Sequence, residues 1–196
     1  MFKEINVREL DRSPIQMISD DWALLTAGKE GDWNTMTVSW GGVGELWGKD
    51  VVFVFVRPQR YTLEFMEKYD EFTLSFFDGE YKKELGICGA KSGRDIDKAA
   101  ETGLVPEYID NAVTFKQAKK VLVCKKVAFK DMTPDGFLDS SIEKWYTNKE
   151  QNLRRHNRKN AYFGIILKIL KNFKLFCKKH LQFEKPCDIL TLALER

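Results

Sequence analysis

Short strand-like segments at irregular spacing, with only two helical patterns between them, constrain the fold of this chain more than any other feature. Residues 51–56 (VVFVFV) and 72–77 (FTLSFF) are rich in β-branched and aromatic residues, which favour strands. Strand patterns also cover residues 22–27, 35–38 and 120–129. Because strands and helices do not alternate regularly, a doubly wound parallel sheet is disfavoured. We therefore expect a mainly β fold, a small β-barrel with short helices, with an α+β fold as the alternative.

The connecting segments complete this expectation. The apolar residues of 62–69 recur with a helical period, with Thr62 at or near the N-terminus of the helix. Residues 92–103 are typical of a helix that Ser92 caps and Gly103 ends. The glycine-rich stretch 41–44 predicts a loop. Residues 51–56 should form a central strand.

The charge distribution divides the chain near residue 150. Residues 1–150 carry 21 Lys/Arg against 26 Asp/Glu, whereas residues 151–196 carry 11 against 3. The expected organisation is one domain over 1–150 and an atypical basic C-terminal segment over 151–196. Within that segment, residues 162–170 fit either a last barrel strand or a basic amphipathic helix. A nucleic-acid or membrane partner is disfavoured, because a basic tail is usually a solvated surface.

Location and metal binding follow from what the chain lacks. The first ten residues are charged and have no apolar stretch typical of a secretory signal, and the apolar runs are too short to span a membrane. The four cysteines form no CxxC pair and are expected to be free thiols in a cytoplasmic protein. Cys177, His180 and Cys187 could supply three zinc ligands, but unrelated tail residues are the favoured interpretation.

The usual catalytic motifs are missing. The stretch GGVGELWG has Trp47 where a dinucleotide fingerprint needs its third glycine, and a strand pattern follows it instead of a helix. Both histidines lie in the tail, which disfavours a Ser-His-Asp triad in the main body. A binding site without an evident acid, base or nucleophile fits an enzyme whose cofactor carries the chemistry.

Three segments offer the groups that bind a flavin nucleotide. RPQRYT places Arg57 and Arg60 beside the Thr62 hydroxyl, which suits a phosphate, although two solvated arginines in a turn are an equally simple interpretation. SGRDIDK is a second anion-binding candidate, or an ordinary helix cap. Residues 34–40 end at the glycine-rich stretch and could line a flavin ring, with Trp40 and Trp47 as core residues in the alternative.

At these residues the sequence resembles the flavin reductase-like family of FMN-binding split β-barrels, and within it the flavoredoxins. The matching segments are NTMTVSWGGVGELWGKDVVFVFVRPQRYT, FTLSFF and LGICGAKSGRDIDKAAETGL, in that order, within residues 10–130. The resemblance implies an FMN-binding homodimer with each flavin near the subunit interface. Relatives usually end with a His-containing segment and a strand bearing Gly-Glu, whereas here a basic stretch follows Tyr146 and Gly164–Ile165 stands at the Gly-Glu position.

The resemblance also implies which residues contact the cofactor. The flavin-contacting segment comprises Asn34, Thr35, Met36, Thr37, Val38, Ser39 and Trp40. The phosphate-binding turn comprises Arg57, Arg60, Tyr61 and Thr62, and a further segment that closes over the cofactor contributes Ser92, Gly93 and Lys98. No catalytic acid, base or metal ligand is assigned.

Three functions remain open at this point. The favoured one is an oxidoreductase that uses NAD(P)H to reduce FMN or an acceptor. The second is an electron carrier of the flavoredoxin type, whose tightly bound FMN exchanges electrons with a redox partner protein. The third is a non-catalytic flavin-binding module.

Overall fold

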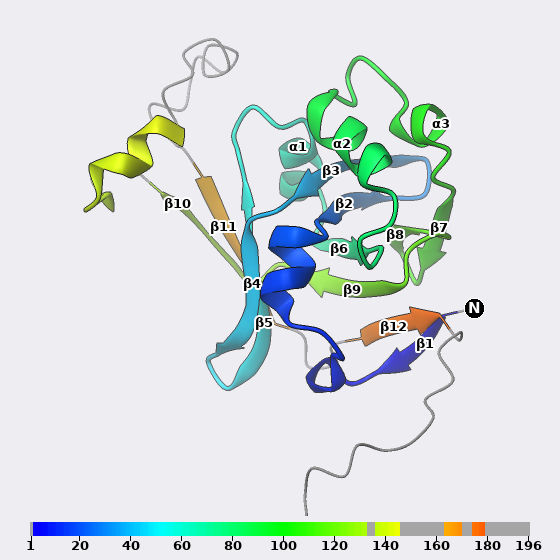
Figure 1. Cartoon of the computed structure of the whole chain (residues 1–196), viewed down its shortest axis with the longest axis horizontal. Helices are drawn as coiled ribbons and strands as arrows, with labels where there is room; N and C mark the ends of the chain where they lie inside the picture. Colours follow the sequence, from blue (N-terminus) through cyan, green and yellow to red (C-terminus); the bar gives the residue numbers. More distant parts are fainter. Residues whose placement is uncertain (1, 133–135, 146–162, 170–173, 179–196) are drawn as a thin grey trace, which may run out of the picture.

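The structure is a computed structural model that describes residues 2–132, 136–145, 163–169 and 174–178. Two antiparallel sheets and a two-stranded ribbon make up most of it (Figure 1). The six-stranded sheet has the order β1 (Phe2–Ile5), β12 (Lys174–Lys178), β9 (Lys120–Lys125), β6 (Glu71–Phe76), β2 (Ala23–Lys29) and β3 (Asp32–Val38). The four-stranded sheet has the order β10 (Ala128–Met132), β11 (Phe163–Ile169), β5 (Lys49–Val56) and β4 (Gly41–Leu46). The ribbon pairs β7 (Pro106–Ile109) with β8 (Ala112–Phe115).

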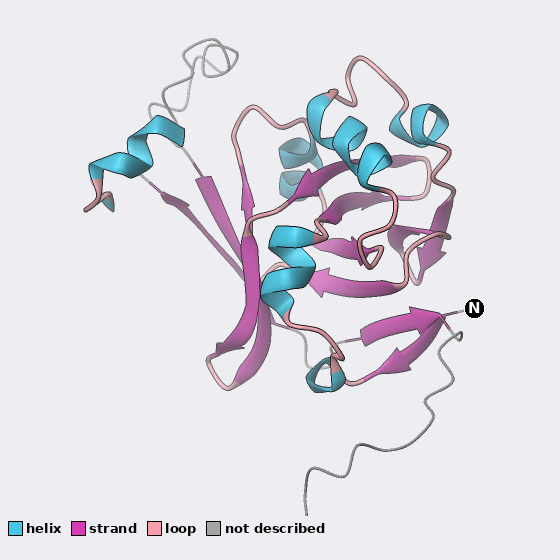
Figure 2. Cartoon of the chain, in the orientation of Figure 1, coloured by secondary structure: helices cyan, strands magenta, loops and turns pink. Residues whose placement is uncertain are grey.

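The helices are short. They are α1 (Thr62–Lys68), α2 (Lys82–Ala90) and α3 (Lys98–Thr102). Figure 2 shows them near the end of the six-stranded sheet formed by β2 and β3, which both α1 and α2 contact. The buried residues of α1 belong to the core cluster on one face of this sheet, whereas those of α2 belong to the cluster on the opposite face. Short helical segments of one or two turns lie at Val7–Glu9, Gln16–Asp20 and Ser140–Trp145. No helix in the described part of the chain is long and apolar enough to cross a membrane.

The three neighbouring strands β9, β6 and β2 of the six-stranded sheet are buried on both faces. Leu25 and Leu74 belong to a core cluster that also contains Val52 and Val54 of the other sheet. Leu24, on the opposite face of β2, belongs to a second cluster that includes residues of α2 and β8. The first six residues of β2 are therefore all buried, and the strand shows no alternation of apolar and polar residues.

Most of the expected strands are confirmed. β5 is central in its sheet, between β4 and β11, and every second side chain from Val52 to Val56 is in the core. β2, β3 and β6 match the segments predicted as strands at 22–27, 35–38 and 72–77, except that residues 22 and 77 lie just outside β2 and β6. Of the two alternatives for residues 162–170, the strand is confirmed, because β11 pairs with both β5 and β10. The basic segment after residue 150 thus contributes β11 and β12, whereas His180 and Cys187 lie outside the described residues.

Three local predictions were wrong. The stretch predicted as a glycine-rich loop is strand β4, which pairs with β5 along its length through a tight turn at Trp47 and Gly48. Both turn residues have positive φ, 56° and 67°, as this type of hairpin turn requires. Residues 120–129 form two strands, β9 and β10, instead of one. The helix predicted over 92–103 is much shorter, as described with the site.

Candidate functional site

Strand β3 contributes the predicted flavin-contacting segment. Met36 and Val38 are buried in the main core cluster, so only their backbone is available to a ligand. Thr37 lies on the opposite face, where its hydroxyl donates to the Leu85 carbonyl of α2. Ser39 and Trp40 follow the strand, and β3 is an edge of its sheet, which leaves one side of its backbone open to other donors and acceptors.

The turn before α1 meets β3 directly. A hydrogen bond from the Arg60 N–H to the Arg57 carbonyl, 3.0 Å long, closes the turn after β5. Thr62 is the first residue of α1 and is buried, and its Oγ1 accepts a 2.8 Å hydrogen bond from Nδ2 of Asn34. The Thr62 hydroxyl keeps its own hydrogen to donate elsewhere. The two segments that were predicted to hold phosphate and ring therefore lie against each other.

The loop of residues 91–97 lies against both segments. A Cβ added at Gly93 would lie 2.0 Å from Oδ1 of Asn34 and 3.3 Å from the Tyr61 ring, so only glycine fits there. Ser92 does not cap a helix, because its Oγ accepts from the N–H of Arg94 at 3.2 Å and the chain stays irregular as far as Asp97. Asp97 is the N-cap of α3 and accepts from the N–H groups of Ala99 and Ala100.

Two cations bind the carbonyl end of α2. Nζ of Lys98 donates to the Cys88 carbonyl at 2.6 Å and to the Thr35 carbonyl of β3 at 2.7 Å. A guanidinium N–H of Arg60 donates to the next carbonyl, that of Gly89. The last carbonyls of a helix have no partner within the helix and carry partial negative charge, which favours cations. Lys98 was predicted to contact the cofactor, but two of its three donors are used within the chain.

Burial changes the acid–base properties of this pair. Desolvation, and then the nearby Arg60 charge, lower the pKa of Lys98 to about 8. Burial also lowers the pKa of Arg60, and the like charge of Arg57 adds to that effect. Neither Arg60 nor Lys98 forms a salt bridge with a carboxylate of the described residues. Because Arg60 is partly buried, the alternative of two solvated arginines is wrong for this residue.

Two other arginines of the site, Arg57 and Arg94, lie over aromatic rings. Cζ of Arg57 lies 5.3 Å from the centroid of the Trp40 ring, which also contacts Trp145 edge-on at 5.5 Å. Cζ of Arg94 lies 4.3 Å from the centroid of the Tyr61 ring. Trp40 is 38% exposed and Trp47 is 62% exposed, so the alternative that these tryptophans are core residues is wrong. Trp40 presents an accessible aromatic surface beside the cationic turn.

We expect the buried charge of Lys98 to give a measurable pH dependence of stability. Above pH 8 the folded chain loses the Lys98 proton while the unfolded chain, with its ordinary lysine pKa, keeps it. The unfolded state then binds more protons, so the free energy of unfolding rises with pH. Relative to Lys98→Met, the wild type should gain about 1 kcal/mol between pH 8 and pH 9 in urea unfolding. Burial also raises the pKa of the Cys88 thiol to about 11, and subtracting the variant cancels this contribution because Cys88 is present in both proteins. A pH-independent difference would contradict the assigned pKa of Lys98.

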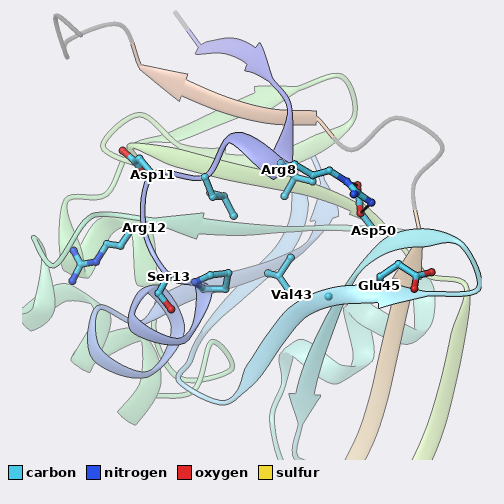
Figure 3. A pocket seen from close by; sticks show the side chains of 11 residues that line it. Arg8, Asp11, Arg12, Ser13, Val43, Glu45 and Asp50 are labelled. Atoms are coloured by element: carbon cyan, nitrogen blue, oxygen red, sulfur yellow. Dashed lines mark hydrogen bonds and ion pairs between the residues drawn. The ribbon is translucent and has the colours of Figure 1, made fainter. Parts of the chain in front are cut away.

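An open pocket of about 580 Å³ lies elsewhere, between residues 7–14 and strand β4 (Figure 3). Figure 3 shows Arg8 beside Asp50, and the structure gives a 2.7 Å ion pair between them. Arg12 pairs with Asp21, and Asp11 pairs with Lys120. Arg8, Asp11, Arg12 and Asp50 of this pocket thus form ion pairs within the chain, in contrast to Arg60 and Lys98.

Sequence reasoning missed the contribution of α2. The carbonyls of Leu85, Cys88 and Gly89 bind three residues of the predicted site, but a backbone acceptor leaves no mark in the sequence. One residue of the sequence, Gly89, did indicate that α2 packs on β3, because an added Cβ would lie 3.2 Å from Cβ of Thr37. A glycine inside a helix that packs this closely on a strand indicates a tight contact.

Similar folds occur among solved structures. A flavoredoxin from Methanosarcina acetivorans has a TM-score of 0.59 at 17% identity over 90% of this chain and 76% of that chain. An FMN-binding domain of a flavin reductases-like enzyme from Shewanella baltica has a TM-score of 0.59 at 12% identity, over 90% and 77%. An NADH:FAD oxidoreductase from Streptomyces globisporus has a TM-score of 0.53 at 11% identity, over 76% and 71%. A search of curated protein sequences gave no match.

The antiparallel sheets and short helices are the split β-barrel of flavin reductase folds, which confirms the predicted fold class. The sequence profile of the flavin reductase like domain matches residues 17–136, more than half of the chain. The chain belongs to this family.

Proposed function

We propose that this chain binds FMN and is an oxidoreductase that uses NAD(P)H as the hydride donor. The observation that carries the proposal is the pair Arg60 and Lys98, partly desolvated and without a carboxylate partner among the described residues. Lys98 binds β3, and Arg57 of the same turn as Arg60 lies over the exposed Trp40 ring. Buried cations of this kind are stabilised when an anion supplies the missing charge. When bound, FMN would accept a hydride from a nicotinamide and pass the electrons to an acceptor.

The residues of the chain would bind and orient this cofactor. The remaining guanidinium donors of Arg60, with Arg57 and the free Thr62 hydrogen, suit the oxygens of a phosphate. The open backbone edge of β3 and the segment up to Trp40 suit the ring, because an edge strand offers N–H groups to a ligand. Gly93 lets the loop pack directly against Asn34, where any larger residue would clash. No side chain is assigned as an acid or base, since orientation alone accelerates hydride transfer between two bound rings.

A homodimer and a redox partner protein belong to the same proposal. The family resemblance supports the dimer, and Trp40 and Trp47 are exposed aromatic residues of the kind that interfaces cover. A carrier function is the second candidate, which the structural likeness to a flavoredoxin supports. In that case the FMN would stay bound and exchange electrons with the partner.

The absorbance spectrum of the purified protein tests flavin binding, and steady-state NADH and NADPH oxidation tests the donor. We expect a flavin band after reconstitution with FMN, and NAD(P)H oxidation with free FMN or an artificial acceptor. A retained flavin with negligible NAD(P)H turnover would favour the carrier. A protein that shows no bound flavin and no NAD(P)H turnover would overturn the proposal and favour a non-catalytic module.

A further inference from the structure

We propose that Lys98 is a positioning residue that holds the loop 91–97 and the end of α2 against β3, and that it responds to an anion bound at Arg60. The first part stands on the structure of the chain alone. The second part rests on the proposed function, because it takes the phosphate of FMN as the anion.

The contacts of Lys98 join three elements. Lys98 begins α3 and is only 6% exposed, yet its ammonium reaches the Thr35 carbonyl of β3 and the Cys88 carbonyl of α2. Cys88 belongs to the last turn of α2, whose carbonyls lack partners within the helix. Removing the ammonium would leave two acceptors unpaired in a region closed to water, and each unpaired buried acceptor is costly.

The position of the loop depends on this contact. The loop runs from the end of α2 to Lys98, and its Gly93 lies directly over the Asn34 side chain that binds Thr62. Lys98 fixes the loop at its C-terminal end, while Arg60 fixes the α2 end through the Gly89 carbonyl. The same two cations thus hold both ends of the segment that covers the proposed phosphate and ring positions.

The charge of Arg60 also acts on Lys98, because the two cations donate to adjacent carbonyls at the end of α2 and the Arg60 charge lowers the pKa of Lys98. The charged or titratable groups that face Lys98 are Cys88 on α2 and Arg60 on the turn before α1, whereas β3 presents the uncharged Thr35. An anion at Arg60 would offset the repulsion that Lys98 experiences, so binding the anion would favour protonated Lys98. By linkage, the anion binds more weakly as the pH rises through the pKa of free Lys98, about 8.

Hydrogen exchange on the flavin-free protein tests the positioning role. Lys98→Met removes both hydrogen bonds but keeps an unbranched side chain of similar length. Lys91→Met is the matched control, because Lys91 is a half-exposed lysine of the same loop that pairs with Glu101 on the surface. We expect faster amide exchange across residues 89–98 in Lys98→Met only, with β6 unchanged. Exchange equal to that of Lys91→Met would overturn the positioning role.

Fluorescence titration with FMN between pH 7 and pH 9 tests the response to the anion. The second pKa of a phosphate monoester is about 6, so the ligand is mainly a dianion over this range. The wild type should bind FMN at least about threefold more weakly at pH 9 than at pH 7, and Lys98→Met should bind weakly at both. Lys98→Arg, which stays charged, should retain affinity at pH 9.

The outcomes separate the two proposals. If the wild type binds FMN but Lys98→Met shows the same affinity and the same pH dependence, the role of Lys98 is overturned and FMN binding stands. If the wild type binds no FMN, the proposed function fails, and with it the response to the anion. The exchange experiment decides the positioning role in that case, because it needs no flavin.

Discussion

Replacing Arg60 by alanine should weaken FMN binding by about 1.5–3 kcal/mol, roughly 10- to 150-fold in Kd. A hydrogen bond to a charged group contributes this much, and the partly buried position of Arg60 limits the competition from water. Fluorescence titration of the variant measures the change. Arg8→Ala is the matched control, because Arg8 is a largely exposed arginine that pairs with Asp50 in a different part of the molecule.

The Gly89 contact of Arg60 requires a second comparison, since Arg60→Ala also removes a bond to α2. Riboflavin has the same ring system as FMN but no phosphate. If Arg60 holds the phosphate, the wild type prefers FMN to riboflavin and the variant loses that preference. An equal loss of affinity for both ligands would instead assign Arg60 a purely structural role, and an unchanged FMN affinity would remove it from the site.

Gly93→Ala should lower the free energy of unfolding by about 1–3 kcal/mol, the usual range for overpacking a filled interior. The added methyl would lie 2.0 Å from Oδ1 and 2.9 Å from Cγ of Asn34, and Tyr61 restricts movement on the other side. Asn34 would have to give up its bond to Thr62, so FMN affinity should fall as well. Urea unfolding and flavin titration of the same preparation measure both effects.

Two further variants test whether the contact with Asn34 causes the loss of stability in Gly93→Ala. Gly86→Ala makes the same change inside α2, where nothing lies within 4 Å of the added Cβ, and should stabilise the chain slightly because alanine favours helices. Combining Gly93→Ala with Asn34→Gly removes the clashing atoms, so the double variant should lose less stability than the two single changes add up to. Strict additivity would show that Asn34 is not the obstacle.

The strands were predictable where local preference and tertiary position agree. β5 and β6 consist of β-branched and aromatic residues and lie in the interior of their sheets, so composition alone indicated them. β4 was missed because glycine disfavours strands, and only its pairing with β5 makes it one. α2 was missed for a similar reason, since Gly86 and Gly89 weaken its helical pattern and only Leu85 and Cys88 are buried.

The site was predictable only in part. The residue types of 57–62 indicated an anion site, but the resemblance to the family, not the spacing, brought that turn together with Asn34–Trp40. The hydrogen bond between Asn34 and Thr62 joins residues 28 positions apart and has no local signal. Ser92 was predicted to cap a helix, but Asp97 supplies two bonds to the first turn of α3 and determines where it begins.

The insertion of β11 between β5 and β10 has a consequence for how the chain can be made. Residues 163–169 pair with β5, more than a hundred positions earlier, and β12 likewise fills the place between β1 and β9. During synthesis, β5 and β9 keep an open hydrogen-bonding edge, and β1 and β10 have no partner strand in these sheets, until residues 163–178 have left the ribosome. Open edges of apolar strands pair readily with other chains. A fragment that stops at residue 150 should therefore aggregate, even though it contains every residue of the proposed flavin site.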